Sequence, residues 1–276
     1  MGIWGKKVVS YLLELAWPGI VIRFGNQPEC DLIIRGPFKS QEPYWNVTPK
    51  PYIYWSGEAN PVEKSPYGTR NLALYTSSRI KNSYYYPFFL ENINLLQSRK
   101  AGRFRKKTLA YCNSNPVRIR EKFYNAIMRL KPDCSEVHAL GKCCGNFPET
   151  RVRVNGTWES GELLQAYEGY NFVMAMENRR VPGYITEKIV NAYAAGAIPV
   201  FWGTSWVSRF FNSNSFVDLS KFLSVNRAAR YILNMGKTDI EKIMSEEPVI
   251  DNEITRFYNS SEYAIRIADK IAGLFA

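Results

Sequence analysis

The spacing of apolar positions in the first hundred residues predicts short elements that alternate between helix and strand. Apolar side chains recur at helical spacing from Lys6 to Ala16, and Pro18-Gly19 ends this predicted helix. Short apolar runs bounded by turn residues then predict strands. These runs cover residues 20–24, 31–35, 51–55, 71–75 and 84–87.

The second half repeats this alternation with a more regular pattern. Ser114 followed by Pro116 is typical of a helix start, so a helix is expected over residues 117–130, after a strand over 108–113. Gly196 is expected to stop a later helix. The remaining expected elements are helices over 162–167 and 186–195, strands over 171–176 and 198–202, a turn and short strand within 213–218, and a mostly helical C-terminal part.

Two halves of this kind predict an α/β protein with two Rossmann-like doubly wound domains facing a cleft. The expected N-terminal domain covers residues 1–100, and the expected C-terminal domain covers residues 108–250. The charge run between them predicts a basic linker over residues 101–107. Residues 251–276 are expected to form a C-terminal helix that packs back on the first domain.

Composition adds the hydrophobic fraction and the net charge to this picture. With 46% hydrophobic residues, the chain can form folded cores, which excludes a disordered protein. Its 36 basic and 25 acidic residues give a net charge of +11, which favours anionic partners such as nucleic acid, phosphorylated cofactors or lipid headgroups. A peripheral membrane contact through basic residues 99–107 fits this charge, although a solvated linker is the preferred interpretation.

The cysteines do not indicate a metal site. There are five, an odd number, with no pair spaced as C-x-x-C, so we expect reduced thiols. Cys134 and Cys143 could still form a disulfide in an oxidising compartment. The single histidine, His138, has no evident partner acid and is expected to be structural.

The densest polar segment covers residues 177–203 and predicts a strand, a loop, a helix and a second strand. Such a loop lies at the carboxyl ends of the strands, where doubly wound sheets bind ligands. Lys188 in the first turn of the helix could bind a diphosphate together with the helix amides, or it could simply point into water. Glu187 could accept two sugar hydroxyls, or it could be an ordinary acidic residue at a helix start.

This segment closely resembles the signature of the α1,3/4-fucosyltransferase family. The family pattern runs Glu-Asn, a short loop, Tyr-x-Thr-Glu-Lys, an apolar helix, Gly-x-x-Pro-Val and Trp-Gly, and every part is present between Glu177 and Gly203. Residues 113–124 are similar to the family segment that supplies an arginine to the diphosphate, with Arg120 better placed than Arg118. Residues 52–58 are similar to the family strand that ends in Gly-Glu.

The resemblance implies a GT-B-type architecture and an inverting transfer of L-fucose from GDP-β-L-fucose to a sugar hydroxyl. The acceptor expected is the 3-OH of N-acetylglucosamine or glucose in a glycan, giving an α1,3 or α1,4 linkage. Glu58 is the implied general base. The implied donor-binding residues are Arg120, Asn178, Tyr184, Thr186, Glu187 and Lys188, with Glu177 and Arg118 as further candidates.

The sequence also bears on cofactors, on location and on the alternative functions. The chain has no Asp-x-Asp motif, so no cofactor and no obligatory divalent metal are expected besides the donor substrate. The apolar stretch over residues 8–22 is interrupted by Glu14 and too short for a spanning helix, which favours a soluble or cytoplasmic protein, or one of the Golgi lumen if an anchor has been removed. The alternatives are a glycosyltransferase of the same fold with another donor or linkage, and a basic nucleic-acid-binding protein, although no nucleic-acid module is evident.

Overall fold

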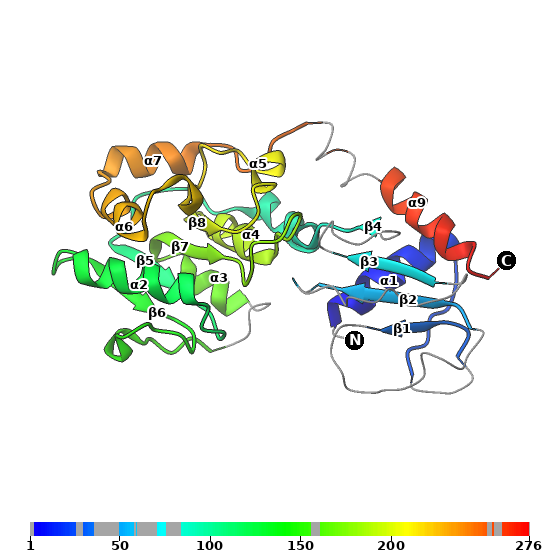
Figure 1. Cartoon of the computed structure of the whole chain (residues 1–276). Coiled ribbons are helices and arrows are strands. Elements are labelled where there is room, and N and C mark those ends of the chain that lie inside the picture. The colour runs from blue at the N-terminus through cyan, green and yellow to red at the C-terminus, as the bar shows by residue number, and fades with distance from the viewer. Residues whose placement is uncertain are drawn as a thin grey trace. The chain divides into compact units, whose positions relative to one another are not determined.

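A computed structural model of the chain divides into two compact units (Figure 1). The first unit comprises residues 1–91, 181–184 and 251–276, and the second comprises residues 92–180 and 185–250. The residues that the structure describes within them are 3–25, 30–35, 50–57, 59, 71–75, 84–155, 161–252, 256 and 261–275.

The second unit is built on a parallel sheet of five strands in the order β6-β5-β7-β8-β9. The strands are β5 (Lys107–Tyr111), β6 (Glu136–Ala139), β7 (Tyr170–Met176), β8 (Ile198–Trp202) and β9 (Val217–Asp218). Every residue of β7 is buried, as its continuous apolar run requires in a strand covered on both faces. The chain leaves β5 toward β6 on one side and returns to β7 on the other, so the direction of winding reverses between β5 and β7.

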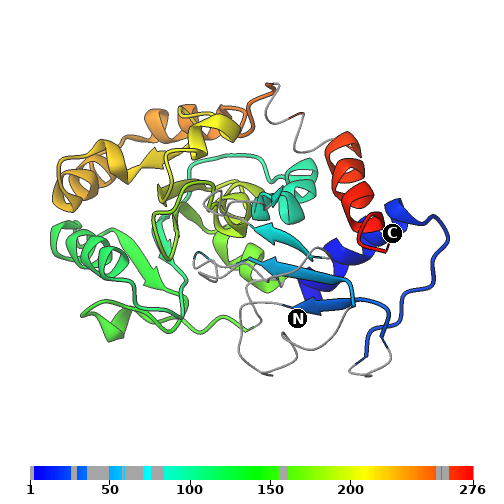
Figure 2. The same cartoon turned by 45° about the vertical axis from the view of Figure 1, so that its right-hand side comes forward.

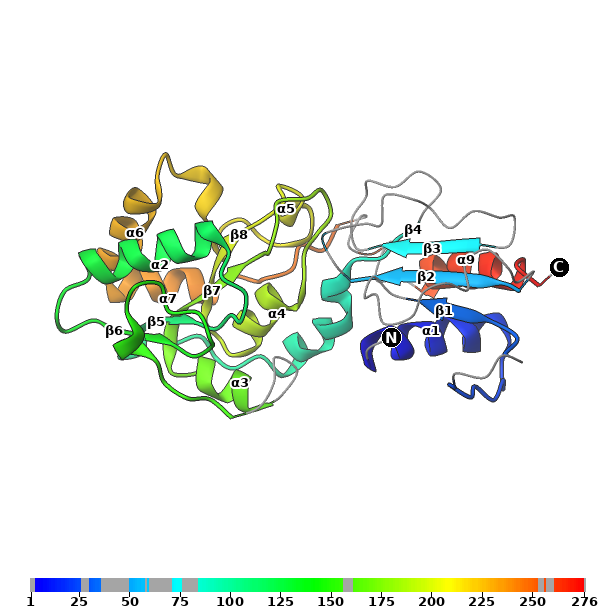
Figure 3. The same cartoon turned by 60° about the horizontal axis from the view of Figure 1, so that its bottom comes forward.

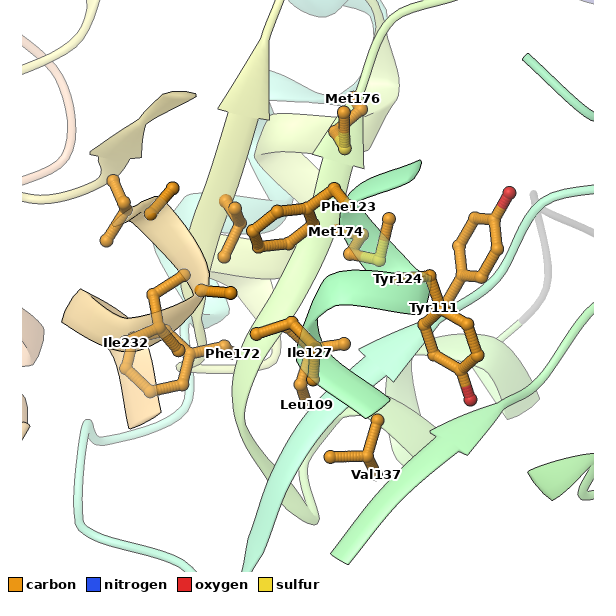
Figure 4. Packing of buried hydrophobic residues seen from close by; sticks show 14 of the residues in the cluster. Leu109, Tyr111, Phe123, Tyr124, Ile127, Val137, Phe172, Met174, Met176 and Ile232 are labelled. Carbon is orange, nitrogen blue, oxygen red and sulfur yellow. The ribbon is translucent and has the colours of Figure 1, made fainter. Parts of the chain in front are cut away.

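Helices cover both faces of this sheet. One core packs α2 (Arg118–Leu130), α6 (Val225–Leu233) and α7 (Lys237–Ser245) against alternate side chains of β5, β7 and β8. Figure 4 shows Phe123 and Ile127 of α2 among Leu109, Phe172 and Met174 of the strands. The opposite face packs α3 (Gly161–Tyr167) and α4 (Glu187–Ala194) against Ala110 and Val173. The remaining elements of this unit are η3 (Pro148–Thr150), α5 (Val207–Phe210) and η4 (Leu219–Lys221).

The first unit contains a parallel sheet of four strands in chain order (Figure 3). The strands are β1 (Ile33–Arg35), β2 (Tyr52–Ser56), β3 (Asn71–Tyr75) and β4 (Tyr84–Tyr85), followed by η2 (Phe88–Ser98). The first and last helices of the chain, α1 (Ile3–Ala16) and α9 (Ser261–Ala272), pack side by side against β2 and β3 (Figure 2). Val9, Leu12 and Ile267 have no exposed surface in this core.

A short loop from the middle of the chain also belongs to the first unit. Val181 and Tyr184 form a buried cluster with Ala59, and the Tyr85 hydroxyl donates a hydrogen bond of 2.8 Å to the Gly183 carbonyl. Gly183 has a φ of 80°, a conformation that favours glycine. This loop connects β7 to α4, both of which are in the second unit.

Two local predictions differ from the structure. Residues 20–25 form no strand, and Ile20 and Val21 are exposed. Among the described residues, no strand pairs with this run. The helix after β5 begins at Arg118 with Val117 as its N-cap, and no side chain caps it, so Ser114 does not start the helix. The α/β class predicted from the two alternating halves is confirmed.

The expected basic linker is part of the second unit, which begins at Asn92. Two arginines of the run bind carbonyls at helix ends. Arg105 donates to the Ala195 and Gly196 carbonyls after α4, and Arg99 donates to the Met244 and Glu246 carbonyls at the end of α7. Cations at helix C-termini are stabilised by the helix dipole, so these charges act within the fold.

Three lysines of the same run also have partners in the second unit. Lys100 lies 3.7 Å from Glu168, and Lys106 lies 2.8 Å from Glu136. The Lys107 ammonium lies over the Tyr170 ring. These lysines thus contact the second unit, while Lys100 and Lys106 keep 60% and 88% of their side-chain surface exposed. Among the described residues, no helix has the length and apolar character needed to cross a membrane.

Gly196 provides a test of the turn after α4. Its φ is 70°, and a Cβ there would meet the Lys100 carbonyl at 2.7 Å and an Arg105 nitrogen at 2.8 Å. We predict that Gly196→Ala lowers the free energy of unfolding by about 2 kcal/mol or more, because a left-handed residue with a Cβ costs roughly 1–2 kcal/mol before any clash. Urea unfolding followed by circular dichroism measures this change.

Gly161→Ala is the matched control, since a Cβ there would meet nothing within 4 Å. Its free energy of unfolding should stay within about 0.5 kcal/mol of wild type. Equal stability of the two variants would contradict the role of Gly196.

Candidate functional site

The carboxyl ends of β5 and β7 meet where the winding of the second sheet reverses. Doubly wound sheets bind ligands outside the carboxyl ends of their strands at such a point. Residues 112–117 follow β5, and Glu177 follows β7 directly. Candidate site residues far apart in sequence therefore lie at one edge of one sheet.

Arg120 joins the two strand ends. It has no exposed surface, and its Nε donates a 3.0 Å hydrogen bond to the carbonyl of Met176, the last residue of β7. Its Nη2 donates to the same carbonyl, and its Nη1 donates to the Asn115 carbonyl in the loop after β5. The guanidinium thus ties both loops together and leaves a positive charge at the reversal point.

Glu177 is a carboxylate with no exposed surface that binds the residue before α4. The Thr186 backbone N–H donates to Glu177 Oε1 at 2.7 Å, and the Thr186 hydroxyl lies 3.0 Å from both carboxylate oxygens. The amide of Thr186 already has a protein acceptor, so the anion at this helix start is Glu177 itself.

Lys188 lies between two carboxylates. Its ammonium is 3.1 Å from Glu187 Oε1 and 3.5 Å from Glu177 Oε2, and it donates a 2.9 Å hydrogen bond to the Thr186 hydroxyl. Its side chain keeps 20% of its surface exposed, so a ligand can reach it.

The pKa values of this cluster follow from burial and charge. Burial lowers the pKa of Lys188, but Glu187 and Glu177 outweigh burial and hold that pKa above its usual value. Burial raises the pKa of Glu177, and the opposing charge of Lys188 does not fully compensate. Lys188 is therefore a cation at neutral pH. The positive charge of Arg120 also acts on Lys188, which places both cations at the same edge of the sheet.

Comparison with known proteins agrees with this arrangement. The family model described as glycosyltransferase family 10 (fucosyltransferase), C-terminal part, matches residues 102–242, which is more than half of the chain. The chain belongs to the family 10 fucosyltransferases. The match includes Arg120, Glu177 and Lys188, and it ends within α7.

Curated relatives carry the same family name. An alpha-(1,4)-fucosyltransferase of Arabidopsis thaliana is 31% identical over 42% of this chain and 31% of its own length. The alpha-(1,3)-fucosyltransferase FucT of Helicobacter pylori is 27% identical over 67% of this chain and 36% of its length. The mouse 4-galactosyl-N-acetylglucosaminide 3-alpha-L-fucosyltransferase 9 is 27% identical over 46% of this chain and 32% of its length. The chain spans about a third of the length of these relatives.

Solved structures share the fold over nearly all of the chain. A crystal structure of an alpha1,3-fucosyltransferase has a TM-score of 0.73 at 18% identity, covering 100% of this chain and 89% of that one. A crystal structure of alpha1,3-fucosyltransferase with GDP-fucose has a TM-score of 0.62 at 20% identity, covering 88% of this chain and 77% of that one. The predicted GT-B-type fold is thereby confirmed.

Four of the predicted site residues lie together at the carboxyl ends of β5 and β7. These residues are Arg120, Thr186, Glu187 and Lys188. Glu177, a further candidate, is at the centre of their hydrogen bonds. Arg118 is exposed at the first position of α2, and Asn178 is half-buried after Glu177. Tyr184 is buried with Ala59 and Val181 in the first unit. Glu58 lies outside the described residues.

The structure adds a reason for the glycine of the Trp-Gly pair, which sequence reasoning did not supply. A Cβ at Gly203 would meet the Phe201 ring at 2.6 Å and Glu177 Cγ at 3.1 Å. Glu177 N–H donates to the Trp202 carbonyl at 2.8 Å, so the two loops run in close contact. Any larger residue at position 203 would have to displace the Phe201 ring and would crowd Glu177.

Cys112 directly follows β5, and the Cys143 amide donates to the Asn113 carbonyl nearby. Within the part of the chain that the structure describes, no three His, Cys, Asp or Glu side chains form a group that could hold a metal ion. Cys134 is exposed and Cys143 is buried, and both are free thiols. His138 contacts the Tyr170 hydroxyl at 3.0 Å, which supports the structural role predicted for it.

Arg120 and Arg118 test the structural part of the site. We predict that Arg120→Met lowers the free energy of unfolding by about 2–5 kcal/mol, because two buried carbonyls lose their donors. Arg118→Met, which removes an exposed arginine two residues away, should change it by no more than about 0.5 kcal/mol. Thermal and urea unfolding of both variants measure the difference, and a stable Arg120→Met protein would contradict this role.

Proposed function

We propose that this chain is an inverting α1,3/4-fucosyltransferase that moves L-fucose from GDP-β-L-fucose to a sugar hydroxyl. The observation that carries the proposal is the pair of cations, Arg120 and Lys188, at the reversal point of a sheet that matches the family 10 model. The crystal structure with GDP-fucose, which shares this fold, supports a nucleotide-sugar donor.

The cations act on the leaving group. As the bond between the anomeric carbon and the diphosphate breaks, its electron pair leaves with GDP, and negative charge grows on the diphosphate. Lys188 and Arg120 would stabilise that charge from fixed positions, which lowers the barrier without reorganisation. Thr186 and Glu187 contact Lys188, so they would position its ammonium and hold hydroxyl groups of the donor. Asn178 and Tyr184 complete the proposed set of donor-binding residues.

The acceptor hydroxyl would attack the anomeric carbon from the side opposite the diphosphate, giving an α-linked product. The transition state at such a centre resembles an oxocarbenium ion. Glu58 would take the proton of the attacking hydroxyl, by its position in the family-like Gly-Glu pair. The names of the relatives support linkage to the 3-OH or 4-OH of an acceptor sugar, and the 3-OH of N-acetylglucosamine or glucose is the acceptor we favour.

Binding and transfer can be separated with two variants. Lys188→Ala should weaken GDP binding about tenfold to a hundredfold, because a hydrogen bond to a charged group contributes roughly 1.5–3 kcal/mol. Glu58→Gln should bind GDP as wild type does and lose about 10²–10⁴-fold in kcat. Calorimetry with GDP and transfer assays on lactose and N-acetyllactosamine measure the two effects.

Lys237→Ala is the control, since Lys237 is exposed and contacts only Glu241 among the described ion pairs. It should leave both GDP binding and transfer unchanged. A wild-type protein that binds no GDP, but binds DNA with an affinity that falls steeply with salt, would overturn the proposal in favour of a nucleic-acid-binding protein.

Metal dependence gives a further test. We expect fucose transfer to proceed at the same rate in buffer with EDTA as in buffer with Mn²⁺, because the two cations provide the charge stabilisation that a metal would otherwise supply. Transfer rates are measured after dialysis against the chelator. A rate that falls with EDTA and returns with Mn²⁺ would show that a metal takes part.

A further inference from the structure

Glu177 takes no part in the proposed transfer step, yet it is the most deeply buried acid of the site. Its carboxylate accepts from the Thr186 amide and hydroxyl, and it lies 3.5 Å from the Lys188 ammonium. An ionised carboxylate without exposed surface is costly unless it is paired and hydrogen-bonded. Glu177 meets this condition through Thr186 and Lys188, so its ionised state depends on those two partners.

Three oxygen-bearing side chains surround the Lys188 ammonium in this structure. It donates hydrogen bonds to Thr186 Oγ1 and Glu187 Oε1, and it forms an ion pair with Glu177 Oε2 at 3.5 Å. A diphosphate that binds Lys188 shares its positive charge with these groups or replaces one of them. In either case Glu177 loses part of its compensating charge when the ligand arrives.

The charged groups around Glu177 indicate which carboxylate takes up a proton when a diphosphate binds. Lys188 and Glu187 face it from α4. The Arg120 guanidinium of α2 binds the carbonyl of Met176, the residue before Glu177, and the adjacent residue after β8 is the uncharged Gly203. Two acids and two cations balance before the donor binds. A diphosphate adds negative charge, and the carboxylate that water does not reach is the one least able to stay ionised.

We propose that Glu177 is the positioning residue of the donor site, where it holds Lys188 and the start of α4 ready for the diphosphate and takes up a proton when that ligand binds. The proton comes from solvent and converts the carboxylate to the neutral acid, which still accepts from the Thr186 amide. The inference rests on the proposed function. Burial, which already raises the pKa of Glu177, supports it.

The test is calorimetry of GDP-fucose binding without acceptor, at one pH, in buffers of different ionisation enthalpy. GDP-fucose is the ligand of choice because it lacks the terminal phosphate of GDP, whose own second pKa lies near 6. The dependence of the observed enthalpy on the buffer gives the number of protons taken up. Wild type should take up protons, and its affinity should rise as the pH falls, by at most about tenfold per pH unit for one proton.

Glu177→Gln is expected to bind GDP-fucose without proton uptake and with an affinity that no longer depends on pH. Glu136→Gln is the matched control, because Glu136 also contacts a lysine, Lys106, but lies at the start of β6, at the amino edge of the sheet. It should take up as many protons as wild type. If circular dichroism shows that Glu177→Gln is unfolded, Glu177→Asp serves instead, and it should keep proton uptake but bind several-fold more weakly.

The outcomes separate this inference from the proposed function. Wild type that binds GDP-fucose without proton uptake overturns the role of Glu177 and leaves the donor specificity standing. Equal proton uptake in wild type and Glu177→Gln overturns it as well, as does loss of uptake in Glu177→Asp. Wild type that binds no GDP-fucose overturns the proposed function and this inference together.

Discussion

A buried guanidinium between two strand ends is the interaction on which the second unit depends. Arg120 spans the reversal point of the sheet and supplies donors to the Met176 and Asn115 carbonyls. Because it has no exposed surface, its charge acts in a medium that screens it weakly. The same side chain therefore stabilises the loops and places a positive charge at this strand edge, so one substitution cannot separate its structural role from its proposed role in donor binding.

The charged cluster around Lys188 is built on that edge. Glu177 follows β7, Lys188 lies in the first turn of α4, and Thr186 connects them through its hydroxyl. Gly203, which directly follows β8, leaves the space that Glu177 needs. Five residues of the family signature, Glu177, Thr186, Glu187, Lys188 and Gly203, are thus in contact with one another through Glu177 and Lys188.

Strands were predicted correctly from the sequence where a continuous run of apolar residues is buried in the fold. The strands over residues 171–176 and 198–202 were predicted because each is a continuous apolar run between turn residues, and both are central strands. The strand predicted over residues 20–24 was wrong. An apolar run becomes a strand only where another strand pairs with it, and the run itself does not show this. The strand β6 was not predicted. It has only four residues, and the polar Glu136 and His138 alternate with two buried apolar residues.

The sequence by itself determined the α/β class, most of the elements and, through the segment from Glu177 to Gly203, the fucosyltransferase family. Only the tertiary structure decided which charges meet. Arg120 and Met176 are 56 positions apart, and Tyr85 and Gly183 are 98 positions apart. Such contacts depend on strand order and on which face each side chain takes, and local hydrophobic patterns do not carry that information.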